Sequence, residues 1–137
     1  MFACHEYAPF HINANVAIGI SDITGAGFGV KAVKFIPKGK VLGRYKGVRL
    51  TKKEYLKLKD KSYVFEVKIS NHNSVYIDGK DINTSNWTRF INGARTKKQQ
   101  KMINIDTYQQ NKNIYFEAIK DIYPGDELIY DYGSHYW

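Results

Sequence analysis

Turn signals recur about every eight to twelve residues along this chain, so its secondary-structure elements must be short. Pro37-x-Gly39 and Pro124-Gly125 each supply a turn, because proline presets φ and glycine tolerates positive φ. Between the turns lie runs of alternating apolar residues, of which 63–69 is the clearest. We therefore predict a mostly β fold of the α+β type, built from small curved sheets with few short helices.

The expected helices are few. Thr51-x-x-Glu54 is a capping box, and it predicts a short helix that ends near Lys61. A second short segment is expected over 87–91. The polar stretch 96–100 is expected to be a solvated loop or a short helix. The expected strands are 17–23, 30–35, 41–48, 63–69, 75–77, 102–108, 114–119 and 128–130, with a hairpin turn at 109–113.

Length and composition fit one domain with one core. The chain has 137 residues, 43% of them hydrophobic, and no apolar run approaches the ~20 residues of a membrane span. No basic stretch followed by an apolar core begins the chain, so we expect no signal peptide and an intracellular protein of the nucleus or cytoplasm. The single Cys4 excludes an internal disulfide, and the four histidines lack metal-ligand spacing, so no metal site is expected. Residues 1–16 are expected to form an N-terminal arm and 17–137 the domain.

Charge and aromatic content both favour a binding function. The net charge is +8, and twelve Lys/Arg against two acids fall between Lys31 and Lys61. A solvated basic face is one interpretation, and attraction to nucleic acid or to a complex that contains it is the other. Aromatic residues make up 15% of the chain, with eleven tyrosines. An aromatic-lined site or a platform for stacking single-stranded bases would each explain this excess.

The segment 121–133, DIYPGDELIYDYG, differs from the basic remainder of the chain. It carries four carboxylates and no Lys or Arg. Its Pro-Gly turn precedes a strand-forming run, and the closing Asp-Tyr-Gly places Tyr132 where the chain must bend. An ordinary hairpin with a core tyrosine is one interpretation of this segment. A site built around Tyr132 is the other.

Separate segments of the chain, in matching order and spacing, resemble the SET-domain protein lysine methyltransferases. They are GAGFGV at 25–30 with the FIPKGKVLGRYKG that follows, NWTRFINGAR at 86–95, and FEAIKDIYPGDELIYDYG at 116–133. The longer middle segment YIDGKDINTSNWTRFINGARTKKQQ at 76–100 resembles the PR/SET subclass, and the ending YGSHYW is similar to small stand-alone viral SET proteins. The resemblance covers about 17–137 and implies the SET-domain β-clip. It implies that 86–95 lies beside the C-terminal run, which threads beneath a loop.

The resemblance implies S-adenosylmethionine as the cofactor. The resemblance implies that the main chain of Ala26, Gly27 and Phe28 meets its methionine end. Glycines at every second position allow close backbone approach, and a glycine-rich hairpin loop is the alternative interpretation of this spacing. Asn92 is expected to hydrogen-bond the cofactor through its side-chain amide. The backbone of Gly93, which stands where the family has histidine, is expected to serve the adenine.

Tyr132 matches the tyrosine whose hydroxyl lies beside the transferred methyl group, where a neutral phenol can orient the amine. Tyr130 stands at a position that acts in this family as a switch between products. A tyrosine there holds the lysine in one orientation, so we expect mainly monomethyl-lysine with some dimethyl-lysine. The residues expected to line the lysine channel, for some of which core packing is the alternative, are Tyr63, Phe116, Tyr136 and Trp137. We assign neither Arg89 nor Arg95 to the site.

Three functions remain open. The first is a protein-lysine methyltransferase that acts on a histone tail or another basic protein, with Lys31–Lys61 contacting nucleosomal DNA and the acidic run 126–131 attracting the substrate. The second is a catalytically weak or silent SET-like module that recruits partners, which Gly93 permits. The third is a basic nucleic-acid-binding domain. Against the third, aromatic residues do not alternate with Lys/Arg along one strand pair.

Overall fold

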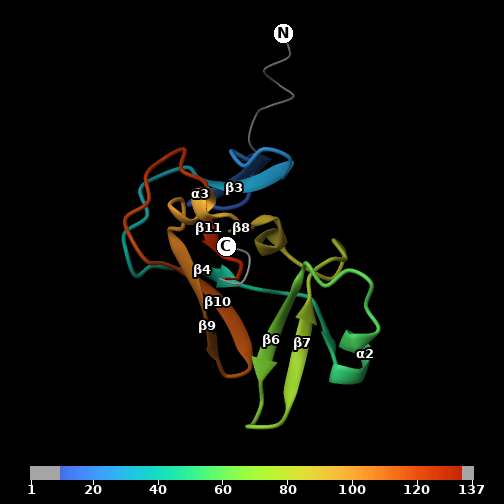
Figure 1. Ribbon diagram of the computed structural model, residues 1–137. Helices are drawn as coiled ribbons and strands as arrows, with labels where there is room; N and C mark the ends of the chain where they lie inside the picture. The colour runs from blue at the N-terminus through green and yellow to red at the C-terminus, as the bar shows by residue number, and fades with distance from the viewer. Residues whose placement is uncertain (1–9, 134–137) are drawn as a thin grey trace. The chain divides into compact units, whose positions relative to one another are not determined.

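The computed structural model describes residues 10–133 (Figure 1). The predicted arm is thus seen only from Phe10 onward, and Tyr136 and Trp137 lie outside the described residues. The chain is mostly strand, as predicted. The strands are β1 (Phe10–His11), β2 (Val16–Ile20), β3 (Phe28–Ala32), β4 (Val41–Arg44), β5 (Val48–Leu50), β6 (Val64–Lys68), β7 (Ser74–Asp78), β8 (Asn92–Ala94), β9 (Ile105–Gln110), β10 (Asn113–Ala118) and β11 (Ile129–Asp131). The helices are α2 (Lys52–Leu56), α3 (Lys97–Gln100) and the 3-10 helix η1 (Trp87–Phe90).

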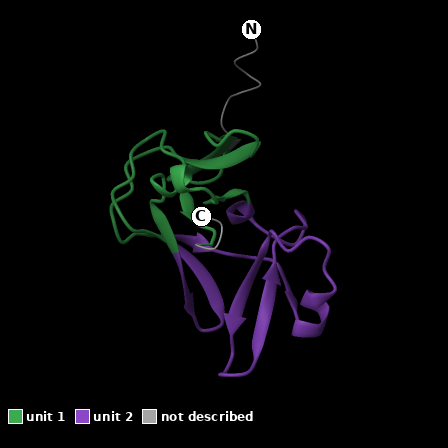
Figure 2. Cartoon of the chain, viewed as in Figure 1, with its two compact units in different colours: residues 1–41, 90–106, 117–137 green, residues 42–89, 107–116 purple. Residues whose placement is uncertain are grey.

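The chain divides into two compact units, coloured separately in Figure 2. Unit 1 comprises Met1–Val41, Phe90–Asp106 and Glu117–Trp137, and unit 2 comprises Leu42–Arg89 and Thr107–Phe116. Both units are therefore assembled from segments that are far apart in the sequence. Each is described separately below.

The antiparallel sheet of unit 1 has the order β1-β2-β3. The C-terminal segment runs along β3: the Leu128 N–H donates to the Val30 carbonyl over 2.8 Å, and Ile36 and Ile122 form an antiparallel bridge further along. Residues 122–128 are therefore paired with β3 and the chain that follows it. The segment does not fold back on itself as an ordinary hairpin.

The end of that segment, β11, pairs in parallel with β8. Ile129 lies opposite Asn92, and Tyr130 lies opposite Gly93. The expectation that 86–95 and the C-terminal run lie side by side is thus confirmed at its central point. Threading of the C-terminal segment beneath a loop stays a prediction.

Unit 1 buries a small apolar core between these segments. The buried Asn104 joins the core to the C-terminal run, since it donates to the Glu127 carbonyl over 2.8 Å and accepts from the Ile129 N–H over 2.9 Å. Each polar group of its amide therefore has a partner, as burial requires. The fully buried apolar residues of this core include Val16, Ala17, Val30, Ile36, Ala94, Ile105, Ile122, Leu128 and Ile129.

Unit 2 contains the sheet β5-β7-β6, with α2 in contact with β5 and β7 (Figure 1). The capping box is confirmed, because Thr51 and Glu54 each bond the other's backbone N–H through their side chains. The helix ends at Leu56 rather than near Lys61. It has no buried residue, and so short a helix gains little without packing. Among the described residues, no helix is long and apolar enough to cross a membrane.

A further three-stranded sheet has the order β4-β10-β9. The β9–β10 turn lies within the predicted range 109–113, with φ values of 50° at Asn111 and 67° at Lys112, as two-residue hairpin turns require. The predicted strand 41–48 is interrupted between β4 and β5. A Cβ on Gly47 would come within 2.2 Å of the Asp78 carbonyl oxygen, so only glycine fits where the chain passes β7.

Candidate functional site

The loop between β2 and β3 contains Ala26 and Gly27, two of the site residues predicted from the sequence, and the third, Phe28, begins β3. The loop is closed by a hydrogen bond of 2.8 Å from the Ser21 N–H to the Gly27 carbonyl. Gly25 and Gly27 have φ values of 83° and 75°, which a side chain would strain. A Cβ on either glycine would meet no atom of residues 10–133 within 4 Å. The main chain of this loop is therefore open to an approaching molecule.

The buried carboxylate of Glu127 fixes this loop to the C-terminal run. Its Oε1 accepts from the Asp22 N–H over 2.7 Å, and the Ser21 hydroxyl lies 2.9 Å from Oε1 and 2.8 Å from Oε2. Glu127 is only 4% exposed. Within residues 10–133, no lysine or arginine lies within ion-pair distance of it. Its partners are therefore neutral donors, which leaves the local charge negative.

The close approach of Glu127 also explains Gly29, the third glycine of the sequence GAGFG, which lies in β3. A Cβ on Gly29 would lie 2.3 Å from Glu127 Oε2 and 2.8 Å from its Cδ. Gly29 has ordinary strand geometry, so space rather than φ requires glycine here. Sequence reasoning counted Glu127 only as part of an acidic run that attracts substrate. That role is excluded for this side chain because it is turned inward, whereas Asp126 and Asp131 are exposed.

Asn92 connects the same cluster from the side of β8. Its Nδ2 lies 2.9 Å from the Phe28 carbonyl oxygen, 3.0 Å from Glu127 Oε2 and 3.2 Å from Ser21 Oγ. The amide nitrogen is thus used within the protein. In the described part of the chain, Oδ1 of Asn92 accepts no hydrogen bond. The group that Asn92 can offer to a ligand is therefore an acceptor.

Tyr130 and Tyr132 lie at the end of β11, next to β8. Their ring centroids are 6.2 Å apart, and a Cβ on Gly93 would come within 2.6 Å of the Tyr132 Cβ. Tyr130 is 9% exposed. Burial, reinforced by the neighbouring Tyr132 and opposed by Arg95, raises the pKa of Tyr130 above its ordinary value of 10.0. Its phenol therefore stays neutral at physiological pH.

Arg95 belongs to this group, although sequence reasoning left it out. Its guanidinium carbon lies 4.0 Å from the centroid of the Tyr132 ring, a cation–π geometry. The Tyr132 N–H also donates to the Ala94 carbonyl over 3.3 Å, which places Arg95 next to the ring. Only the pairing of β8 with β11 brings these residues together, so no local sequence signal could have identified the contact.

Phe28 supplies an apolar surface beside the glycine loop. It is 61% exposed, and its ring packs edge-on against Phe90 with centroids 6.5 Å apart. An aromatic residue so exposed next to an open main chain is available to a ligand. All seven cofactor-binding and catalytic residues predicted from the sequence thus fall in unit 1.

The two channel residues that the structure describes fall in unit 2. Phe116 is fully buried, with its ring near those of Tyr45 and Phe65 at centroid distances of 6.2 and 5.9 Å. Tyr63 is half-buried, and its carbonyl accepts the Tyr45 hydroxyl over 2.6 Å. The Arg89 guanidinium carbon lies 4.9 Å from the Tyr63 ring centroid. Core packing, the alternative left open above, accounts for Phe116, whereas Tyr63 retains exposed surface.

Comparison with known proteins identifies the family. A family model that describes the PR domain of PR domain zinc finger protein 2 matches residues 16–137. The chain belongs to the PR-domain family. This PR domain is 42% identical to histone-lysine N-methyltransferase set-17 of Caenorhabditis elegans over 116 residues, which are 85% of this chain and 40% of that protein. It is 32% identical to human histone-lysine N-methyltransferase PRDM7 over 120 residues, 87% of this chain and 23% of that protein.

Solved structures support the same assignment. The methyltransferase domain of human PR domain-containing protein 2 matches with a TM-score of 0.74 and 29% identity, covering 90% of this chain and 80% of that chain. The predicted SET-type fold is therefore confirmed. This PR domain spans less than half the length of the two relatives above.

Proposed function

We propose that this PR domain transfers a methyl group from S-adenosylmethionine to a lysine of a histone or another basic protein. The parallel pairing of β8 with β11 carries the proposal, because it gathers Asn92, Gly93, Tyr130 and Tyr132 beside an open glycine loop. The names of the relatives from Caenorhabditis elegans and human support this reaction and a histone as the substrate class. Such a substrate is consistent with action in the nucleus.

The chemistry of the site fits the proposed cofactor. S-adenosylmethionine carries a sulfonium and an ammonium group, which suit the negative charge that Glu127 leaves near the loop. The open main chain at 26–28 would hold its methionine end, and Asn92 Oδ1 would accept a hydrogen bond from an N–H of the cofactor. The exposed ring of Phe28 would cover apolar surface, and the Gly93 backbone would serve the adenine. Among residues 10–133, no three His, Cys, Asp or Glu side chains are grouped to hold a metal ion.

Bound S-adenosylmethionine supplies an activated methyl group. A neutral lysine amine would attack this methyl carbon: the new C–N bond would form as the C–S bond breaks, S-adenosylhomocysteine would leave with the C–S electron pair, and the methylated ammonium would then lose a proton to water. Tyr132 would orient the lone pair of the amine with its hydroxyl, and Arg95 would hold the Tyr132 ring in position. Tyr130, neutral and buried, would present a second hydroxyl. Tyr63 would line the channel, with Phe116 supporting it through Tyr45.

A catalytically silent PR domain that only recruits partners is the second candidate, and one observation favours it. The amide nitrogen of Asn92 is engaged by Phe28, Ser21 and Glu127, so the loop is already held together by protein groups. A silent domain could keep this arrangement for stability alone.

Calorimetry of cofactor binding tests the proposal. We expect S-adenosylmethionine to bind the full chain. The Asn92→Ala variant should lose roughly 1–3 kcal/mol of binding free energy, because the Phe28 carbonyl and Glu127 lose a donor and the N–H of the cofactor loses its acceptor. Thermal melting of both proteins serves as the control for folding. A parent protein that melts cooperatively yet takes up no S-adenosylmethionine would support the silent module.

A further inference from the structure

The positive charge of the chain is concentrated in unit 2. Unit 2 carries twelve Lys/Arg against five Asp/Glu, a net charge of +7, whereas unit 1 carries nine against eight, a net charge of +1. The basic region Lys31–Lys61 is divided between them, with its members from Arg44 onward in unit 2. A charge of this size on one unit attracts polyanions at low ionic strength.

Two arginines of unit 2 converge on one neutral acceptor. Arg49 Nη2 lies 2.8 Å from Asn113 Oδ1, and Arg44 Nη1 lies 3.4 Å from the same oxygen. Arg49 Nη1 also donates to the Lys112 carbonyl over 2.8 Å. Within residues 10–133, neither of these two arginines forms an ion pair with a carboxylate. Like charges gathered without a counter-ion are stabilised when an anion binds between them, and guanidinium groups match phosphate in geometry.

A pair of tyrosines lies on the same face of the β9–β10 hairpin. Along β10 buried residues alternate with half-buried ones: Ile114 and Phe116 are buried, whereas Asn113 and Tyr115 are half-buried and share the other face. The Tyr108 ring stacks on Tyr115, with centroids 5.5 Å apart and an interplanar angle of 22°. Aromatic faces beside cations are the two features with which proteins bind single-stranded nucleic acid.

We propose that Arg44 and Arg49 form a phosphate-binding site for single-stranded nucleic acid, and that the Tyr108–Tyr115 pair stacks on its bases. The search for aromatic residues that alternate with Lys or Arg along one strand pair could not find this site. Its two arginines belong to β4 and β5, whereas its tyrosines belong to the β9–β10 hairpin. The site lies entirely within unit 2 and needs neither the cofactor nor methyl transfer. Its test is therefore independent of the proposed enzyme function.

Asn113→Asp is the sharpest variant. It keeps the shape of the side chain and places a carboxylate within reach of both arginines, at the loss of one long 3.3 Å bond from Asn113 Nδ2 to the Asn111 carbonyl. The arginines stay present but gain an internal counter-ion. We expect affinity of the cofactor-free full chain for a fluorescent twelve-residue oligothymidylate to fall at least about tenfold, with no loss of melting temperature.

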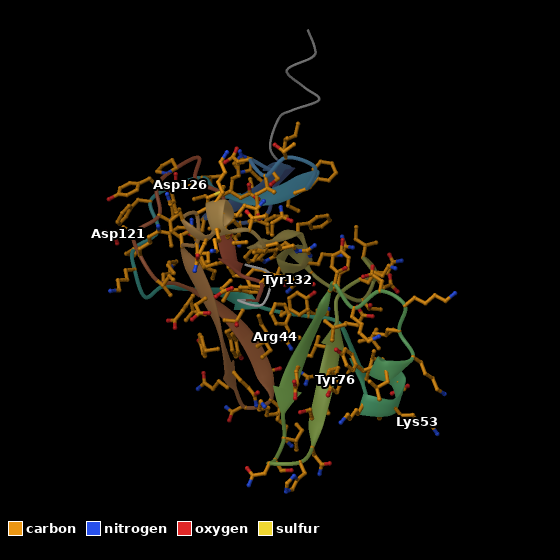
Figure 3. The ribbon with its side chains drawn as sticks, in the orientation of Figure 1. Arg44, Lys53, Tyr76, Asp121, Asp126 and Tyr132 are labelled. Atoms are coloured by element: carbon orange, nitrogen blue, oxygen red, sulfur yellow. The ribbon has the colours of Figure 1, made fainter. Side chains whose placement is uncertain are left out.

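Matched double variants complete the experiment. Arg44→Gln with Arg49→Gln is expected to reduce oligothymidylate affinity at least about tenfold, and the slope of log affinity against log salt by about 1.4. Lys53→Gln with Lys57→Gln removes the same charge from α2 and its C-cap, where Lys53 lies away from Arg44 (Figure 3), and is expected to cost less than about threefold. Tyr115→Leu is expected to weaken oligothymidylate binding several-fold while sparing a DNA duplex.

Three outcomes would overturn the proposal. The first is an equal loss from the α2 pair, which would show diffuse attraction by surface charge. The second is parent-like binding by Asn113→Asp. The third is binding to vesicles that contain phosphatidylserine with none to the oligonucleotide, which would make the surface a membrane contact.

Discussion

Gly93 lies against Tyr132 so closely that no side chain fits between them. A Cβ built on Gly93 would lie 2.6 Å from the Tyr132 Cβ and 3.0 Å from its Cδ1. The histidine that the wider SET family carries at this position would therefore require a different placement of Tyr132. We predict that Gly93→Ala destabilises the domain by about 1–3 kcal/mol, the range for overpacking, and lowers methyl transfer as Tyr132 is displaced. Denaturant unfolding and a transfer assay measure the two effects.

Gly19→Ala is the matched control for this prediction. Gly19 lies in β2 within the same unit, and a Cβ there would meet no atom of the described part of the chain within 4 Å. We expect the Gly19→Ala variant to be at least as stable as the parent, since alanine restricts the unfolded chain. If both variants leave stability and transfer unchanged, the contact with Gly93 does not position Tyr132.

The second prediction concerns Glu127, which holds the glycine loop. Glu127→Gln replaces one acceptor oxygen with an NH2 group that must face N–H donors of Asp22 or Asn92. We expect cofactor affinity to fall roughly tenfold, because a buried donor is left facing a donor. Asp126→Asn makes the same charge change at the adjacent exposed residue, labelled in Figure 3, and should have little effect. Equal losses by calorimetry would refute the role of Glu127.

The third prediction follows from the burial of Tyr130. Because its folded-state pKa is raised above 10.0, the folded protein holds this proton more tightly than the unfolded chain. The stability it contributes is complete below pH 10 and is lost as the pH rises beyond that value. We predict that Tyr130→Phe loses less unfolding free energy than the parent between pH 9 and pH 11. Denaturant unfolding of both proteins at each pH measures this loss. An equal loss of unfolding free energy in the parent and in Tyr130→Phe would contradict the prediction.

The elements that the sequence predicted well are those governed by local chemistry. The capping box at Thr51 and the β9–β10 turn depend on residues next to one another, so their signals are complete in the sequence. The helix at Thr51 was predicted too long because its end depends on packing. Strand 41–48 was likewise predicted as continuous because the approach of Asp78 to Gly47 is a tertiary contact.

The site was predictable in its residue types but not in its connections. The resemblance pointed to Asn92 and Tyr132, and the β8–β11 pairing brings their segments together. Glu127 and Arg95 were missed because each acts through contacts between segments that are distant in the sequence. Glu127 in particular is indistinguishable from its exposed acidic neighbours until its burial is known.

The fourth prediction concerns the product. The ring centroids of Tyr130 and Tyr132 are 6.2 Å apart. Residues two apart in extended chain point to the same side, as a role for Tyr130 in controlling the methylation product requires. We expect the parent to give mainly monomethyl-lysine, with some dimethyl-lysine. Tyr130→Phe removes one hydroxyl with little change in volume and should raise the higher methylation states without abolishing activity. Mass spectrometry of a methylated peptide measures the ratio of mono-, di- and trimethyl-lysine. An unchanged ratio in Tyr130→Phe would exclude a role for Tyr130 in controlling the product.

The central claim is tested most directly by transfer of an isotopically labelled methyl group. The full chain is incubated with S-adenosylmethionine that carries a deuterated methyl group and with histone-tail peptides, alongside a Tyr132→Phe variant that melts like the parent. Mass spectrometry then locates the label. We predict a labelled methyl on a lysine Nζ, formed at least about tenfold more slowly by Tyr132→Phe, since alignment of the amine is lost. No label on any lysine of histones or other basic proteins, from a parent that binds the cofactor, would contradict the account.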